Sequence, residues 1–175
     1  MATHTRDELS RALGCVVYDM LILLAALSFY RRRHQYPVYP ELTWGEPQIA
    51  IDLILLKSRA IMDFLSPKTP SRNDIRITDF GLPAVTLSPA LQTFRKSVNQ
   101  WTVHLSWQRA LKESRGAPQP ARADMEAHAC SLLSAAHQAV CDCIAAGVTF
   151  TESRHQSFYR TFLREYGSMV KPTTS

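Results

Sequence analysis

The chain has 175 residues, of which 46% are hydrophobic and 20% charged, so it is long and apolar enough to bury a core of its own. That composition argues against a disordered chain, and the 6 Gly are fewer than the tight turns of an all-β protein would normally use. The net charge of +5 permits contact with an anionic partner such as RNA but does not require one.

The first predicted element is a long helix from about Arg6 to Arg33. Thr3 or Thr5 is a suitable N-cap, and the acidic residues that follow suit the positive end of the helix dipole. Residues 16–29 are apolar nearly all round the helix, which predicts burial on more than one side.

This apolar run allows two interpretations. It is shorter than the ~20 residues that cross a bilayer, and Asp19 within it would be costly in lipid. A buried core helix is therefore favoured over a membrane anchor, although the three arginines that follow resemble the basic flank of an anchored segment. We expect a cytoplasmic protein with no membrane partner.

A second helix is predicted from about Pro47 to Leu65, and it is very apolar. Its few polar residues are therefore informative. Asp52, Arg59 and Asp63 follow one another at spacings of seven and four, which place them on one face of the helix.

A long connection, residues 66–87, separates the second helix from the third. Ile75-Arg76-Ile77 alternates in polarity, which allows a single strand or a short helical piece. The connection also contributes Asp74 and Asp79. A loop of this length in a compact domain is often functional or packed against the core.

Three further helices complete an all-α prediction. The third begins after the N-cap Ser88, and Gly147 ends the fourth. They run over about 89–113, 121–146 and 152–166. We therefore predict one bundle of about five helices over residues 1–167, with a flexible tail at 168–175.

Polar residues of the second and third helices, with those of the loop between them, form the main candidate site. The candidate catalytic residues are His104, Asn99 and Arg109. The accompanying polar network consists of Asp52, Arg59, Asp63, Asp74 and Asp79. A His beside carboxylates can act as a general acid or base, and an Arg can hold a phosphate. The alternative is structural, because an Arg–Asp network also satisfies polar groups on a buried helix without any reaction.

Metal and cofactor sites are not expected. Cys130, His137 and Cys141 share a helix and could form part of a metal site, but buried free thiols are the commoner outcome. The sequence contains no Gly-rich phosphate loop, HExxH motif or nucleophile elbow.

Short motifs between Ile49 and Arg109 follow a distinct order: a helix with Arg and Asp-Phe, an acidic loop, and a helix with Asn and His-Leu. They are LKSRAIMDFL at 56–65, NDI at 73–75, TDF at 78–80 and NQWTVHL at 99–105. This pattern resembles a group of uncharacterised bacterial helical proteins that is similar to the HEPN superfamily of nucleotide- and RNA-associated helical bundles.

The resemblance implies either a ribonuclease or a related non-catalytic module. Active HEPN ribonucleases pair an Arg with a His a few residues later, across a dimer interface, and cleave RNA without metal. Here His104 would be the His, but Asn99 stands in the Arg position and supplies no permanent charge to the transition state, while Arg95 lies too far upstream.

We therefore expect a non-catalytic helical interaction module, dimeric and RNA-associated, in a defence or toxin–antitoxin-like setting. Its expected partners are a second copy, RNA or another protein. The alternative function is a metal-independent ribonuclease that uses His104.

Overall fold

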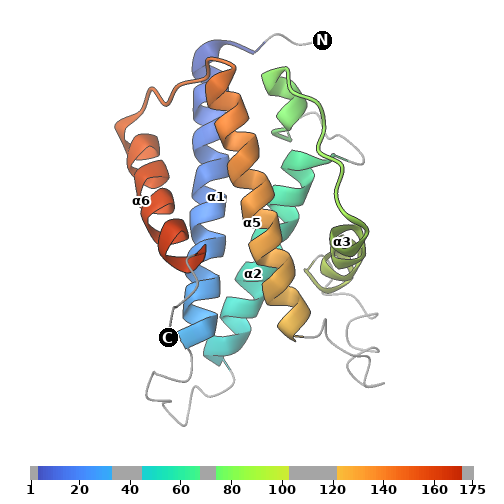
Figure 1. The fold of residues 1–175 in the computed structure, drawn as a ribbon. Coiled ribbons are helices and arrows are strands. Elements are labelled where there is room, and N and C mark those ends of the chain that lie inside the picture. The colour runs from blue at the N-terminus through green and yellow to red at the C-terminus, as the bar shows by residue number, and fades with distance from the viewer. Residues whose placement is uncertain (1–3, 33–44, 68–73, 103–121, 171–175) are drawn as a thin grey trace.

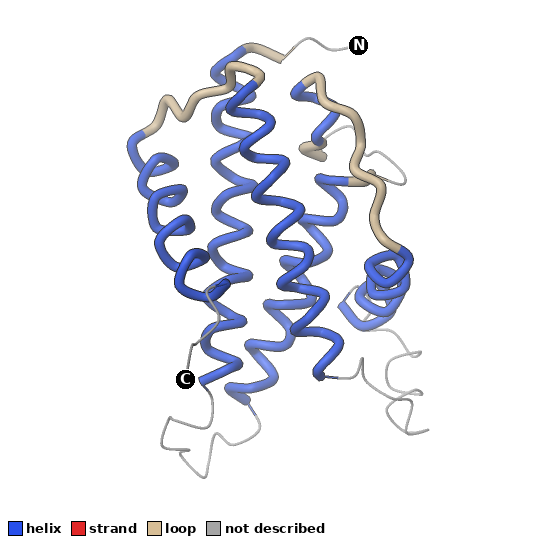
Figure 2. Tube along the Cα trace, viewed as in Figure 1, coloured by secondary structure: helices blue, strands red, loops and turns tan. Residues whose placement is uncertain are grey.

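The computed structural model describes residues 4–32, 45–67, 74–102 and 122–170. Its helices are α1 (Arg6–Arg32), α2 (Gly45–Leu65), α3 (Pro89–Thr102), α5 (Arg122–Ala145) and α6 (Ser153–Val170), with a short 3-10 helix at Ile77–Phe80. Within these ranges there is no strand, as Figure 2 shows, so the predicted all-α bundle is confirmed.

The helix α1 occupies the middle of the bundle, where it packs against α2, α5 and α6 (Figure 1). By length and composition it could cross a membrane, with a mean hydropathy of 2.1 over its most apolar window. Half of that window is buried against the other helices, as in the core helix of a bundle. Its largest fully buried side chains are Leu13, Met20, Leu23, Leu24 and Leu27.

Two helix N-termini form where the sequence indicates. The Glu8 backbone N–H donates to Thr5 Oγ1 at 3.2 Å, and the Thr5 N–H donates to Glu8 Oε2 at 2.7 Å, which makes a reciprocal capping box at the start of α1. At the start of α3, the Leu91 N–H donates to Ser88 Oγ at 3.3 Å.

The end of α5 depends on Gly147, whose φ of 93° lies in the left-handed region. Its N–H donates to Ile144 O at 3.0 Å, and the next N–H, from Val148, donates to Cys143 O at 3.1 Å. This pair of bonds is a Schellman motif, which satisfies carbonyls that the helix leaves unpaired. The predicted stop at Gly147 is correct.

Of the two structures that the sequence allows around Ile75–Ile77, the described part of the loop shows the short helical one. It is the 3-10 helix at Ile77–Phe80, whose Phe80 ring packs edge-on against Phe64 of α2 at 6.0 Å. The last helix differs from the prediction, since it ends at Val170, four residues beyond the predicted end at 166. The predicted part of the third helix beyond Thr102 lies outside the described residues.

The contact between α1 and α6 relies on a residue without a side chain. His155 of α6 is buried and its imidazole lies directly against Gly14 of α1, where an added Cβ would overlap the ring. Just before α6, Thr151 binds Ser10 of α1 twice, through its backbone N–H and its hydroxyl, both at 2.9 Å. The start of α6 is therefore held in one position on α1.

We expect Gly14→Ala to lower the free energy of unfolding by about 1–3 kcal/mol, because the overlap with His155 outweighs the ~1 kcal/mol that Ala normally gains over Gly in a helix. Urea denaturation measures the change. The control is Gly167→Ala in α6, where an added Cβ meets nothing within 4 Å and only the helix-propensity gain should appear. Equal effects of the two substitutions would contradict this account of the contact.

Candidate functional site

Arg95 of α3 is the centre of the polar network that the structure describes. Its side chain is 4% exposed and forms an ion pair with Asp63 of α2. Its Nη1 donates to the Ser66 carbonyl at 2.6 Å, just beyond the end of α2. Arg59 Nε lies 3.5 Å from the other carboxylate oxygen of Asp63. One buried guanidinium thus joins α3 to the end of α2.

This arrangement favours a structural role for the network. The guanidinium of Arg95 is closed off from solvent, so it is not presented to a phosphate. Its Nη1 and Nη2 bind a carbonyl and a carboxylate, while its buried Nε has no hydrogen-bond partner among the described residues. A buried charge requires such partners, since its desolvation is otherwise unfavourable. Asp63 is the solvent-exposed member of this ion pair, with 42% of its side chain exposed.

Asp79, another predicted network member, has its partner within the loop after α2. Asp79 accepts from the Arg76 backbone N–H at 2.9 Å and lies 3.7 Å from that residue's Nε, so it caps its own 3-10 turn. Asp52 and Asp74 are exposed. The spacing argument therefore identified Arg59 and Asp63 as neighbours, whereas Asp79 binds within its own turn.

Of the predicted catalytic residues, Asn99 is exposed on α3, whereas His104 and Arg109 lie outside the described residues. The residue that links the two helices, Arg95, was not among the predicted site residues. The sequence held a signal for it, because Leu91, Arg95 and Val98 follow at spacings of four and three along the buried stripe of α3. Because a charged side chain at a core position needs a counter-charge or hydrogen-bond acceptors, Arg95 on this stripe predicts a partner on a neighbouring helix.

A second polar cluster lies where α6 meets α1. Glu152 Oε2 lies 2.6 Å from Arg154 Nε and 4.0 Å from His155 Nε2. Its other carboxylate oxygen, Oε1, lies 3.5 Å from Arg11 Nε. The imidazole Nδ1 of His155 has no hydrogen-bond partner among the described residues. Arg11 and Arg154 are largely exposed, so this cluster anchors the helix start at the surface.

The half-buried His137 and Cys130 and the buried Cys143 have surroundings typical of packing residues. His137 contacts the rings of Phe162 at 5.6 Å and Tyr166 at 5.4 Å, and burial lowers its pKa. Burial also raises the pKa of the Cys130 thiol and raises that of Cys143 to about 11. Across the described ranges, no group of three or more His, Cys, Asp or Glu is arranged to hold a metal ion.

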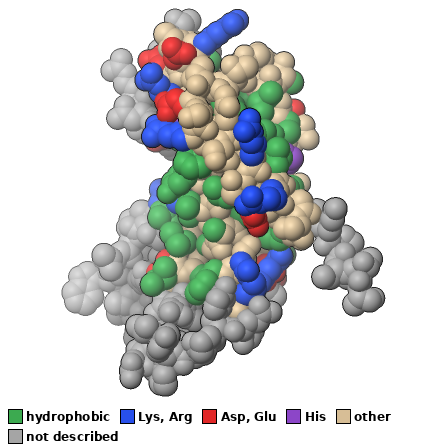
Figure 3. All heavy atoms as spheres, turned by 90° about the vertical axis from the view of Figure 1, so that its left-hand side faces the viewer, with side chains coloured by type: hydrophobic (Ala, Val, Ile, Leu, Met, Phe, Trp, Pro, Cys, Tyr) green, Lys and Arg blue, Asp and Glu red, His purple; other side chains and the backbone are tan. Residues whose placement is uncertain are grey.

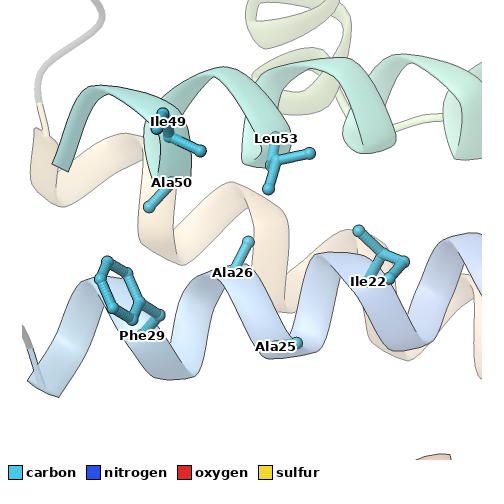
Figure 4. Close-up of a pocket in the computed structure, with 7 residues that line it drawn as sticks. All are labelled: Ile22, Ala25, Ala26, Phe29, Ile49, Ala50 and Leu53. Carbon is cyan, nitrogen blue, oxygen red and sulfur yellow. The ribbon is translucent and has the colours of Figure 1, made fainter. Parts of the chain in front are cut away.

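An apolar groove lies between the C-terminal half of α1 and the start of α2, with a volume of about 360 Å³. In Figure 4, small alanines lie between the larger side chains of the two helices. The groove is lined by Ile22, Ala25, Ala26, Phe29, Ile49, Ala50 and Leu53, and each of these is apolar. Ile49 is 61% exposed, and Leu56 of the next turns of α2 is 51% exposed.

Comparison with protein-family models, curated proteins and solved structures finds no match to this chain.

We expect Asp63→Ala to lower the free energy of unfolding by about 2–3 kcal/mol, because it leaves the buried Arg95 without its carboxylate. Arg59→Ala, which removes only a half-exposed i,i+4 pair, should cost about 0.5 kcal/mol or less. Replacing both charges, as in Asp63→Ala with Arg95→Met, should restore part of the loss. Thermal and urea denaturation would measure all three, and an equal cost for the two single substitutions would argue against a central role for Arg95.

The thiols should differ in their reaction with iodoacetamide. Cys15 is exposed, whereas Cys143 is fully buried with a pKa raised to about 11. Because the thiolate is the reactive form, Cys143 should stay unmodified at pH 9 while Cys15 reacts, and should react only after unfolding. Mass spectrometry of labelled peptides would show the difference, and rapid labelling of native Cys143 would contradict the burial.

Proposed function

We propose that this chain is a non-catalytic helical module that binds another polypeptide through one apolar face, made by the outer sides of α1 and α2. The observation that carries the proposal is the groove between these helices, whose seven lining residues are all apolar. A site for a small molecule usually adds a few polar groups that orient the ligand. An apolar helix surface needs no such groups.

The face extends beyond the groove along both helices at helical spacing. On α1 it consists of Cys15, Tyr18, Ile22, Ala25 and Phe29, which follow at alternating steps of three and four. On α2 it consists of Ile49, Leu53, Leu56 and Ala60, at the same steps. Each of these residues is exposed or half-buried. Such paired stripes are the usual acceptor for an amphipathic helix.

Two observations support a function without catalysis. The buried guanidinium of Arg95 already binds Asp63 and the Ser66 carbonyl. Asn99 stands where the HEPN ribonucleases have their catalytic arginine, and it is exposed and uncharged. The resemblance to HEPN proteins is compatible with an interaction module, because related inactive domains bind RNA or proteins. Metal-independent cleavage of RNA through His104 is the alternative that an experiment must exclude.

The face can be blocked without disturbing the core. Ala25 is an exposed residue that lines the groove, and Arg is a good helix former, so Ala25→Arg should fold normally while it places a charged side chain at the groove. Ala127→Arg is the matched control, because Ala127 is exposed on α5, away from the groove. Polypeptides crosslinked to the wild type and to Ala127→Arg in cells should be lost with Ala25→Arg.

Two results would overturn the proposal. Equal recovery of crosslinked polypeptides with all three proteins would show that the face is not used. Cleavage of RNA by the purified chain in the presence of EDTA, if it disappeared in a folded His104→Ala variant, would show a nuclease instead.

A further inference from the structure

We infer that the partner segment is an amphipathic helix with an acidic side chain just beyond one end of its apolar stripe, where it pairs with Arg32 of α1. The inference rests on the proposed function and specifies the chemistry of the polypeptide that the groove accepts. The two ends of the groove differ. One end is closed by side chains that already contact one another, and the other lies beside an exposed cation.

The closed end of the groove lies one turn before Ile22 on α1. Lys57 of α2 reaches across to Asp19 of α1, and its Nζ lies 2.6 Å from the carboxylate Oδ1. The same Nζ lies 5.9 Å from the centre of the Tyr18 ring, and that ring packs against Phe158 of α6 at 5.3 Å. The two charges at this end therefore neutralise each other within the chain.

Farther toward the N-terminus of α1, acidic and basic side chains are mixed. Arg11 Nε, one turn before Cys15, lies 3.5 Å from Glu152 Oε1, and the first turn of α1 carries Asp7 and Glu8. Figure 3 shows acidic and basic side chains together near the top of the molecule, above hydrophobic ones. Charges of both signs offset one another there, so this end of α1 does not select the charge of a partner.

The opposite end of the groove is cationic. The last turn of α1 carries Arg31 and Arg32. Arg31 is turned toward α5, where it pairs with Glu126. Arg32 is exposed and lies three residues beyond Phe29, which lines the groove. Its Nε donates to the Ser28 carbonyl at 3.3 Å, and a carbonyl accepts this bond without neutralising the charge. An acidic side chain of the partner would supply the counter-charge.

The exposed carboxylate of α2 near the groove does not change this asymmetry. Ala50 and Ile54 of α2 are buried, and Asp52 lies two residues from each of them. Two residues correspond to more than half a turn, so Asp52 points to the other side of the helix. It lies on the outer flank of α2, away from a helix that is seated between α1 and α2.

The length of the groove sets the spacing in the partner. From Ile22 to Phe29, α1 advances about 10 Å, which is about two turns of helix. In Figure 4, these two side chains stand at the ends of a gap that Ala25 and Ala26 leave on α1. A partner helix fills such a gap with apolar residues at i, i+4 and i+7. Its acidic residue should follow in the next turn, as Arg32 follows Phe29.

The primary test is selection from a displayed library of helical peptides, with the purified full chain as bait. Each peptide carries Leu at i, i+4 and i+7 and random residues in the turn at either end. Peptides are kept when they bind the wild type and Ala127→Arg but not Ala25→Arg. Asp and Glu should be enriched by about threefold or more in one flanking turn. Flanks with no acidic preference, or with a basic one, would overturn the inference.

The contact with Arg32 is tested by charge reversal with one selected peptide. Fluorescence anisotropy at low salt measures its affinity, because an exposed ion pair is least screened there. Arg32→Glu should weaken binding by on the order of fivefold, since it replaces an attractive pair by a repulsive one. A peptide with Lys in place of its acidic residue should bind Arg32→Glu better than the wild type.

Arg11→Glu is the matched control, because it makes the same change on the same side of α1, about 30 Å away. It should leave the affinity unchanged. Circular dichroism establishes that both variants are folded. Equal effects of Arg11→Glu and Arg32→Glu would overturn the inference, as would a Lys peptide that gains nothing from Arg32→Glu.

Failure of this inference is distinguishable from failure of the proposed function. If the selected peptides require the groove but share no acidic flank, the groove binds polypeptides and only the role of Arg32 is wrong. If no peptide distinguishes the wild type from Ala25→Arg, the proposed function fails as well. Self-association of the wild type, or its binding to phosphatidylcholine vesicles, would identify a different occupant if Ala25→Arg abolished it, and would overturn the inference.

Discussion

The structure depends on the need to cover one helix that is apolar on almost every side. Burial of apolar surface is the main favourable term in folding, so an exposed α1 would be unstable in water. The other helices cover it on successive sides: α2, α5 and α6 all pack against it. The remaining stripe, from Cys15 to Phe29, is left together with the outer side of α2. The incomplete cover of α1 is thus the physical origin of the face on which the proposed function rests.

A second constraint fixes α3 against this core. The apolar stripe of α3 is short, and Arg95 interrupts it with a charge. Because that charge is buried, the helix can pack only where Asp63 and the Ser66 carbonyl meet the guanidinium. The ion pair therefore ties α3 to the end of α2, and it gives Asp63 a structural role on an otherwise apolar helix.

The sequence predicted most of the fold because its signals are local. Capping by Thr5 and Ser88 and the stop at Gly147 depend on neighbouring residues, and the structure shows each of them. The candidate site was harder, since spacing shows which residues share a face of one helix but not what the facing helix brings. Arg59 and Asp63 were placed correctly as neighbours, whereas their link to Arg95 depends on how α2 and α3 pack. The end of the last helix was predicted at residue 166, although α6 continues through Gly167 to Val170.

The close approach of Gly14 and His155 has an evolutionary consequence. A side chain at position 14 and a ring at position 155 cannot occupy the same space, so the two positions are not free to vary independently. In proteins descended from the same ancestor, any larger residue at position 14 should accompany a small one at position 155. These two positions lie at opposite ends of the chain, and their joint variation would identify distant relatives by a shared contact where overall sequence similarity has been lost.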